Sequence, residues 1–168
     1  MAEVLGNLYR IAPAVALAAI GLACDGPSPL AESQAEVPAD WRNEAPVMRV
    51  TLPDGFVVQA ELKTSPEDRA RGMMFRPTIP EDRGMLFIFP RMERQGFWMY
   101  NTLVPLDIIW LDDNKQVVEI AANTPPCRSR DARDCPSYGG STPSVYVLEL
   151  GTGQAIKHGV KVGETLEF

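Results

Sequence analysis

The sequence has few of the residues from which common active sites are built. It contains one histidine, His158, among 168 residues. A zinc site built on several histidines is therefore excluded, and a Ser-His-Asp triad is possible only if His158 is its base. No glycine-rich loop is followed by the lysine of a phosphate-binding loop. Because His158 lies beside Lys157 near an expected helix end, we expect it at the surface.

Positive charge is also scarce. The formal net charge is −6 at pH 7, whereas a nucleic-acid-binding face needs an excess of basic groups to displace counterions. The arginine-rich stretches at 69–76 and 128–133 have acidic residues within them or directly beside them: Glu67, Asp68, Asp131 and Asp134. Such mixed clusters are typical of solvated surfaces, so we expect no nucleic-acid partner.

The apolar run at 11–23 is too short to cross a bilayer, which takes about 20 residues. It follows Arg10 and has the length of an export-signal core. The small residues that end at Ala23 precede Cys24, an arrangement that resembles the bacterial lipoprotein processing site. We therefore expect residues 1–24 to be an export signal, with three alternatives: lipidation of Cys24, plain cleavage near Ala23, or an uncleaved anchor. The protein would then lie in the periplasm or cell envelope, with membrane contact only through this signal or a lipid.

Three cysteines is an odd number, which leaves one thiol to explain. Cys127 and Cys135 lie in one proline-flanked loop and are predicted to form a structural disulfide in an oxidising compartment. Closing that loop stabilises by about 2–3 kcal/mol on the chain-entropy model. A redox or metal pair would need the closer Cys-x-x-Cys spacing. Lipidation would account for Cys24.

Residues 25–46 are rich in proline, alanine, glutamate and serine, with one aromatic residue, Trp41. Too few apolar groups are present to offset the entropy of ordering, so this stretch is predicted to be a flexible linker. The globular domain is predicted to span residues 47–168. This length is sufficient for one domain with its own core.

The pattern after residue 46 is mainly β. Turn residues at 53–55 and 112–115 predict two hairpins. A short helix should begin after Ser65, which can cap it, and end at Gly72. The expected strands are 47–52, 56–62, 84–89, 96–101, 106–111, 116–121, 144–150 and 165–168, with one helical turn at 153–158. The predicted fold is mainly β, in the α+β class: a compact single-domain β-barrel or tightly folded sheet with one or two short helices.

Three segments identify a family resemblance. Residues 71–76 (RGMMFR), 84–87 (GMLF) and 97–107 (FWMYNTLVPLD), in that order, resemble the domain-of-unknown-function 192 family. The resemblance covers residues 47–168. Tyr100 departs from the family pattern, which usually has a basic residue there. Because the family has no assigned activity, the resemblance implies no catalytic residue.

Asn101 and Asp107 are polar residues inside a stretch that is otherwise almost wholly apolar, and burying such groups costs free energy unless partners satisfy them. In one interpretation, Asp107 accepts backbone N–H bonds and fixes the bend at 102–105. In the other, polar groups converge on a small pocket with apolar walls, the usual form of a ligand site. The predicted polar groups are Asn101, Asp107 and Arg76, and the predicted walls are Trp98, Trp110 and Tyr138.

Five of the seven methionines fall within residues 73–99: Met73, Met74, Met85, Met92 and Met99. Thioethers are ligands for soft metals such as Cu(I), but methionine also fills irregular space in cores rich in aromatic residues. The spacing follows no regular ligand repeat, which favours packing. We expect no resident cofactor.

Two function classes remain. The first is a non-enzymatic envelope module that binds a small ligand or an envelope protein through Arg76, Trp98, Asn101, Asp107 and Tyr138. The second is a hydrolase-type enzyme in which Asp107 is the general base and Asn101 or Arg76 stabilises developing negative charge. A second carboxylate near Asp107, for which Glu149 is the candidate, would favour the enzyme.

Overall fold

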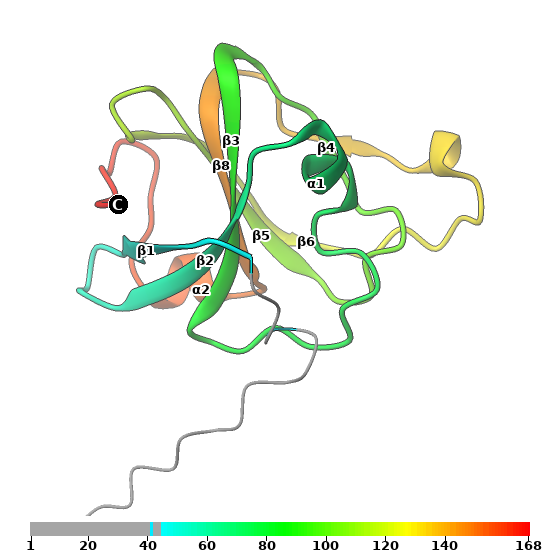
Figure 1. The fold of residues 1–168 in the computed structure, drawn as a ribbon, viewed down its shortest axis with the longest axis horizontal. Coiled ribbons are helices and arrows are strands. Elements are labelled where there is room, and N and C mark those ends of the chain that lie inside the picture. Colours follow the sequence, from blue (N-terminus) through cyan, green and yellow to red (C-terminus); the bar gives the residue numbers. More distant parts are fainter. Residues whose placement is uncertain (1–40, 42–44) are drawn as a thin grey trace, which may run out of the picture. The chain divides into compact units, whose positions relative to one another are not determined.

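The computed structural model describes residue 41 and residues 45–168 (Figure 1). The predicted export signal, Cys24 and all of the predicted linker except Trp41, Ala45 and Pro46 lie outside the described residues. The elements are β1 (Val47–Thr51), β2 (Val57–Lys63), α1 (Pro66–Arg71), β3 (Arg83–Arg94), β4 (Phe97–Trp98), β5 (Leu106–Leu111), β6 (Val117–Thr124), the 3₁₀ helix η2 (Ala132–Asp134), β7 (Ser137–Tyr138), β8 (Pro143–Gly151) and α2 (Gln154–Lys157). Neither described α-helix has the length and apolarity that a membrane span requires.

Six of the strands form one mixed sheet in the order β1-β2-β3-β8-β5-β6. The pair β2–β3 is parallel and the other pairs are antiparallel. This arrangement confirms the mainly β prediction, in its tightly folded sheet form rather than as a closed barrel. Residues 106–111 lie inside the sheet, since β5 pairs on one side with β6 and on the other with β8.

The C-terminal segment spans the two edges of this sheet. Thr51 of β1 forms an isolated bridge with Glu167, and Gln116, just before β6, forms one with Thr165. Figure 1 shows the segment in red beside the first hairpin. The prediction of a regular strand at 165–168 is therefore wrong. Thr165 and Glu167 each form an isolated bridge with a different edge of the sheet, instead of pairing with one neighbouring strand.

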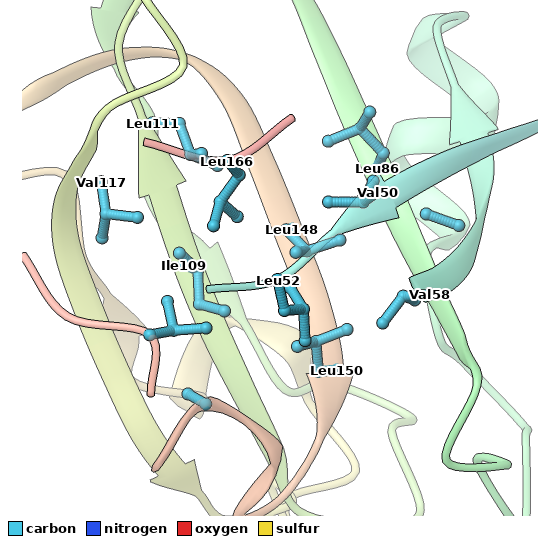
Figure 2. Close-up of a cluster of buried hydrophobic side chains, with 13 residues drawn as sticks. Val50, Leu52, Val58, Leu86, Ile109, Leu111, Val117, Leu148, Leu150 and Leu166 are labelled. Carbon is cyan, nitrogen blue, oxygen red and sulfur yellow. The ribbon is translucent and has the colours of Figure 1, made fainter. Parts of the chain in front are cut away.

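The sheet packs apolar side chains on both of its faces. Alternation along β3 sends Leu86 and Ile88 to one face and Met85 and Phe87 to the other. The first cluster includes Leu52, Ile109 and Leu148, which meet in Figure 2, together with Ala155 of α2. The second cluster comprises Trp41, Met73, Met85, Phe87, Met99, Leu106, Ile108, Trp110 and Val147.

The local signals around α1 work as predicted. The Ser65 side chain accepts a hydrogen bond from the Asp68 backbone N–H, and Pro66 occupies the first helical position. Gly72 ends the helix with φ +44°, in a region that glycine enters without a steric penalty. The end of the helix therefore places Gly72 beside Phe87 of the second cluster.

The predicted strand at 96–101 is much shorter, because only Phe97–Trp98 pairs, with β7. Asn101 has φ +55° and ends any extended run there. The loop that leads to β7 is closed by the predicted disulfide between Cys127 and Cys135, which is confirmed. A two-residue strand such as β7 has no periodicity from which it could be predicted.

His158 is buried, with 4% of its surface exposed, so the prediction of a surface position is wrong. Its ring stacks on Phe56 at 4.2 Å between centroids. Its Nδ1 lies 2.8 Å from the Asp54 carboxylate, and its Nε2 lies 3.0 Å from the Gln154 side-chain oxygen. Because α2 packs against the turn of the first hairpin, distant residues cover a position that the local sequence leaves open.

Candidate functional site

Asp107 is fully buried, and both of its carboxylate oxygens are occupied by the backbone. Oδ1 accepts a hydrogen bond from the Asn123 N–H and Oδ2 accepts one from the Ala155 N–H, each at 2.9 Å. The first contact fixes the end of β6, where Asn123 has φ +52°, and the second caps the first turn of α2. Asp107 therefore accepts backbone N–H bonds, as the structural interpretation expects, but it fixes the end of β6 and the start of α2 rather than the bend at 102–105.

The predicted convergence of Arg76, Asn101 and Asp107 is not found. Asp107 lies opposite Leu150 in the sheet register, which places its side chain on the face of the first cluster. Arg76 instead pairs with Glu61 on the other face.

Asn101 stabilises a loop rather than facing Asp107. Its carbonyl accepts a hydrogen bond from the Phe75 N–H at 2.9 Å, and its Nδ2 lies 4.0 Å from the Met74 sulfur. Tyr138, in β7, packs against the second cluster. Of the residues predicted for one pocket, Trp98 and Arg76 line the hollows described below, whereas Asp107 and Tyr138 do not.

Two other carboxyl groups share the second face of the sheet. In the register of the central strands, Glu61 of β2 lies opposite Met85 of β3, and Met85 lies opposite Glu149 of β8. Directly opposed residues point to the same face, so the two glutamates flank Met85 on that face. Both are buried, with 2% of Glu61 and 4% of Glu149 exposed.

Glu61 is charged and fully paired. The Arg76 guanidinium donates to both of its oxygens at 2.9 Å, and the Lys63 ammonium donates at 2.9 Å. Burial acts to raise the pKa of Glu61, but the hydrogen bonds from Arg76 and Lys63 outweigh it and hold the pKa below its usual value.

Arg76 also stacks on Trp41, 3.9 Å from the ring centroid, and the Trp41 indole N–H donates to the Thr78 carbonyl at 2.9 Å. Trp41 therefore packs on the domain, although it lies in the predicted linker.

Glu149 has the opposite environment. Its Oε2 is buried and has no hydrogen-bond partner among the described residues. Burial raises the pKa of Glu149 to about 8, even though the charges of Lys63 and Arg76 act to lower it. At neutral pH the carboxyl is therefore protonated and can both donate and accept a hydrogen bond.

A small cavity of about 20 Å³ opens beside Glu149. A water molecule needs roughly 10–15 Å³ by this measure, so the cavity has room for one water or for one polar atom of a ligand. Its lining joins the end of α1 to the segment after β4: Arg69, Ala70, Arg71, Gly72, Met73, Met74, Phe87, Phe97, Trp98, Tyr100, Thr102 and Glu149.

Gly72 keeps the approach to Glu149 open. A Cβ atom at this position would lie 3.2 Å from the Phe87 ring and 3.7 Å from Glu149 Oε2. A side chain longer than that of alanine would therefore extend into the space beside the carboxyl. The positive φ of Gly72 disfavours such a side chain as well.

A larger hollow of about 270 Å³ shares Arg71, Gly72 and Met74 with this cavity. Its other lining residues are Ala45, Glu61, Lys63, Asp68, Phe75 and Arg76. We call the small cavity and this hollow together the α1 cleft. The cleft thus brings the two buried glutamates to one surface region, although each faces a different part of it.

Exposed aromatic side chains border the α1 cleft. Phe75 is 62% exposed and Trp98 is 45% exposed. Phe75 also has φ +65°, which is an outlier for a bulky side chain. Backbone strain of this kind persists where surrounding contacts hold it, and it concentrates at functional sites. Here the contact that holds it is the hydrogen bond to Asn101.

The methionines mainly fill the core. Met73, Met85 and Met99 are buried in the second cluster, Met92 is exposed on the far half of β3, and Met74 lines the α1 cleft. No group of three or more histidine, cysteine, aspartate or glutamate side chains suited to a metal ion occurs among the described residues. These positions fit the packing interpretation.

The sequence suggested Glu149 only as a second carboxylate near Asp107, but the two side chains lie on opposite faces of the sheet. The available signal was an acidic residue in an alternating strand, between Leu148 and Leu150, both of which are buried. Only the register of β3 and β8 shows that position 149 faces the second cluster rather than solvent. Gly72, which opens the cavity, was identified only as the end of a helix.

Comparison with known proteins adds a family but no activity. The family model described as "DUF192: Uncharacterized ACR" matches residues 49–168. No curated protein matches the chain. A solved protein of unknown function from Novosphingobium aromaticivorans DSM 12444 is 33% identical, with a TM-score of 0.65 over 73% of this chain and 85% of that one. A proposed transcription regulator from Sinorhizobium meliloti 1021 is 31% identical, with a TM-score of 0.62 over 71% of this chain and 89% of that one.

Proposed function

The chain belongs to the DUF192 family of uncharacterised proteins, and from this premise we propose that it is a binding module whose α1 cleft holds a small organic ligand. The observation that carries the proposal is Glu149. A buried oxygen without a partner costs free energy, and this one lines a cavity that a single polar atom can enter. A ligand that supplies that atom would recover the lost hydrogen bond.

The surroundings of Glu149 support a ligand with an apolar part. Trp98 and Phe75 expose aromatic surface at the border of the α1 cleft, and Met74 lines both of its parts. Ligand sites usually combine such apolar walls with a few aimed polar groups. The ligand would place its polar end at Glu149 and rest its apolar end on the aromatic rings.

We further propose that the module works in the cell envelope. The disulfide between Cys127 and Cys135 suits an oxidising compartment, and the apolar run at 11–23 is predicted to direct export. Mass measurement of the protein in the envelope and cytoplasmic fractions of its own cells tests this location. A lipid on Cys24 or cleavage near Ala23 would support it, whereas an intact N-terminus in the cytoplasmic fraction would contradict it.

The geometry favours binding over acid–base catalysis. Two carboxyl groups with opposite pKa shifts are a usual feature of acid–base enzymes, and Glu61 and Glu149 have such shifts. However, both oxygens of Glu61 are taken by Arg76 and Lys63, which leaves it unable to accept a proton readily. Asp107, the predicted base, lines no described pocket and already accepts two backbone hydrogen bonds.

The description of the Sinorhizobium meliloti protein as a proposed transcription regulator applies to that protein. This chain has a net charge of −6, which is unfavourable for the phosphate contacts on which nucleic-acid affinity depends. We therefore propose a small ligand, not DNA, as the partner.

The proposal is tested by calorimetric titration of the purified full chain with benzoate, benzamide and benzylamine. These probes combine one aromatic ring with an anionic, a neutral and a cationic end. At least one should bind, with a Kd on the order of a millimolar for molecules of this size. The proposal is wrong if none of the three binds.

Two glutamate variants locate the binding. Glu149→Leu removes the polar end of the site, and because it also removes an unpaired buried carboxyl, the variant should remain folded. It should lose binding of the probe that the wild type binds. Glu93→Leu makes the same change at an exposed position on β3 and should bind the probe as the wild type does. Equal binding by both variants would place the site elsewhere.

A further inference from the structure

The charges around Glu149 restrict the chemistry of a ligand. Within the described residues, the ionisable groups that face the α1 cleft come from β2 (Glu61 and Lys63), from α1 (Asp68, Arg69 and Arg71) and from the loops (Arg76 and Tyr100). At neutral pH, with Glu149 protonated, the basic groups outnumber the acidic ones. The cleft is thus locally cationic in a chain whose net charge is −6.

Most of these basic groups already have partners. Arg76 and Lys63 bind Glu61. Arg69 lies over the Phe89 ring and donates to the carbonyls of Thr64 and Ile88.

Arg71 differs from the other basic groups. It is exposed at the end of α1 and lines both parts of the cleft, and its side chain makes no hydrogen bond or ion pair with any described residue. Among the described residues that line the cleft, it is therefore the cation that remains available to an incoming ligand.

A carboxylate matches this pair of groups. One of its oxygens can accept the hydrogen bond that the protonated Glu149 donates, and it can be the single polar atom that the cavity has room for. The other oxygen can accept from the Arg71 guanidinium, whose planar donors suit a carboxylate. An ammonium group would instead meet Arg71, Lys63 and Arg76, and a neutral amide would form no ion pair with Arg71.

Resting on the proposed function, we propose that the α1 cleft selects a carboxylate that carries an apolar or aromatic group. Glu149 donates its hydroxyl hydrogen to one carboxylate oxygen, and Arg71 pairs with the other. Trp98 contacts the apolar group, since it lines the cavity and is 45% exposed. No bond is made or broken in this recognition, and the proton stays on Glu149.

The same three probes test the selection. Benzoate should bind at least tenfold more tightly than benzamide or benzylamine at pH 7. The affinity for benzoate should fall about tenfold between pH 7 and pH 9, because Glu149 loses its proton in this range while benzoate stays ionised. Tighter binding of benzylamine, or an affinity for benzoate that rises with pH, would overturn the selection while leaving the proposed function intact.

Two further variants separate the roles of Glu149 and Arg71. Glu149→Gln keeps a donor that does not titrate, so it should bind benzoate and lose the dependence on pH. Arg71→Gln should weaken benzoate binding at least tenfold and keep the dependence on pH. Arg91→Gln makes the matched change on β3, outside the cleft lining, and should bind as the wild type does. An unchanged pH dependence in Glu149→Gln would contradict the proposed role of Glu149.

Discussion

Asp107 and Glu149 are buried carboxyl groups on neighbouring strands of one sheet, yet their surroundings are opposite. Asp107 accepts two backbone hydrogen bonds on the face of the first cluster, whereas Glu149 has an oxygen without a partner in the described part of the chain, on the other face. Burial alone therefore does not indicate a function for an acid. The hydrogen bonds that remain unmade are the better indication.

The surroundings of Asp107 and Glu149 also differ in what completes their hydrogen bonds. Asp107 joins three segments of the fold, and both of its carboxylate oxygens accept hydrogen bonds from the backbone. Glu149 lies beside a cavity that Gly72 keeps open, with exposed aromatic side chains nearby. The hydrogen bonds of Asp107 are completed by the protein's own backbone, and those of Glu149 are proposed to be completed by a ligand.

The largest effect is expected from Glu149→Gln at high pH. The pKa of Glu149 is raised from 4.5 to about 8 by folding, so the folded state holds a proton that the unfolded state releases between these values. The wild type should therefore lose stability as pH rises through this window, by up to about 4 kcal/mol. The Gln variant lacks this loss. Urea unfolding at pH 5 and pH 9 should give similar free energies at pH 5 and a more stable variant at pH 9.

Equal free energies of unfolding for wild type and Glu149→Gln at pH 9 would show that Glu149 is hydrated and ionised in the folded protein. Glu149 would then have satisfied hydrogen bonds, as Asp107 has, and the proposed difference between the two carboxyl groups would be wrong.

A smaller effect is expected from Asp107→Ala, which leaves the N–H groups of Asn123 and Ala155 without their acceptor. Each lost hydrogen bond costs about 1–2 kcal/mol, so the variant should be less stable by about 2–4 kcal/mol in urea unfolding at pH 7. Asp107→Asn keeps one acceptor oxygen and should lose less. Benzoate affinity should not change in either variant that remains folded. Loss of binding at unchanged stability would reject the structural role of Asp107.

The smallest effect is expected from Glu61→Gln, which weakens the ion pairs with Arg76 and Lys63. Because these basic side chains are 11% and 12% exposed, solvent can partly replace the lost contacts, and the cost should be about 1–2 kcal/mol at pH 7. The pKa of Glu61 is lowered by folding, so its contribution is present above pH 4.5 and is lost as pH falls further. The difference in unfolding free energy between variant and wild type should thus shrink toward pH 3, in contrast to Glu149→Gln. A difference that persists at pH 3 would contradict this assignment.

Local sequence signals were sufficient for much of the fold. Alternation and turn residues predicted the hairpins around 53–55 and 112–115, and capping residues predicted the short helix that Gly72 ends. The cysteine spacing predicted the disulfide. These features depend on neighbours in sequence, which a local pattern records.

The parts that were missed depend on distant partners. The C-terminal segment divides its bridges between two sheet edges, and His158 is covered by the turn of the first hairpin. The apolar sequence around Asp107 predicted that its side chain is buried. It did not predict that the N–H groups of Asn123 and Ala155 are its hydrogen-bond partners. Glu149 was expected only as a second carboxylate near Asp107. The register of β2, β3 and β8, which no local pattern determines, places it on the other face, beside Glu61.

The most direct test of this account is a titration of the Glu149 side-chain carboxyl carbon by ¹³C NMR in the full chain, with Glu149→Gln used to assign its signal. We predict a midpoint near pH 8, which benzoate should move still higher because an anion at the site favours the protonated carboxyl. A midpoint near the ordinary value of 4.5, unmoved by benzoate, would contradict it.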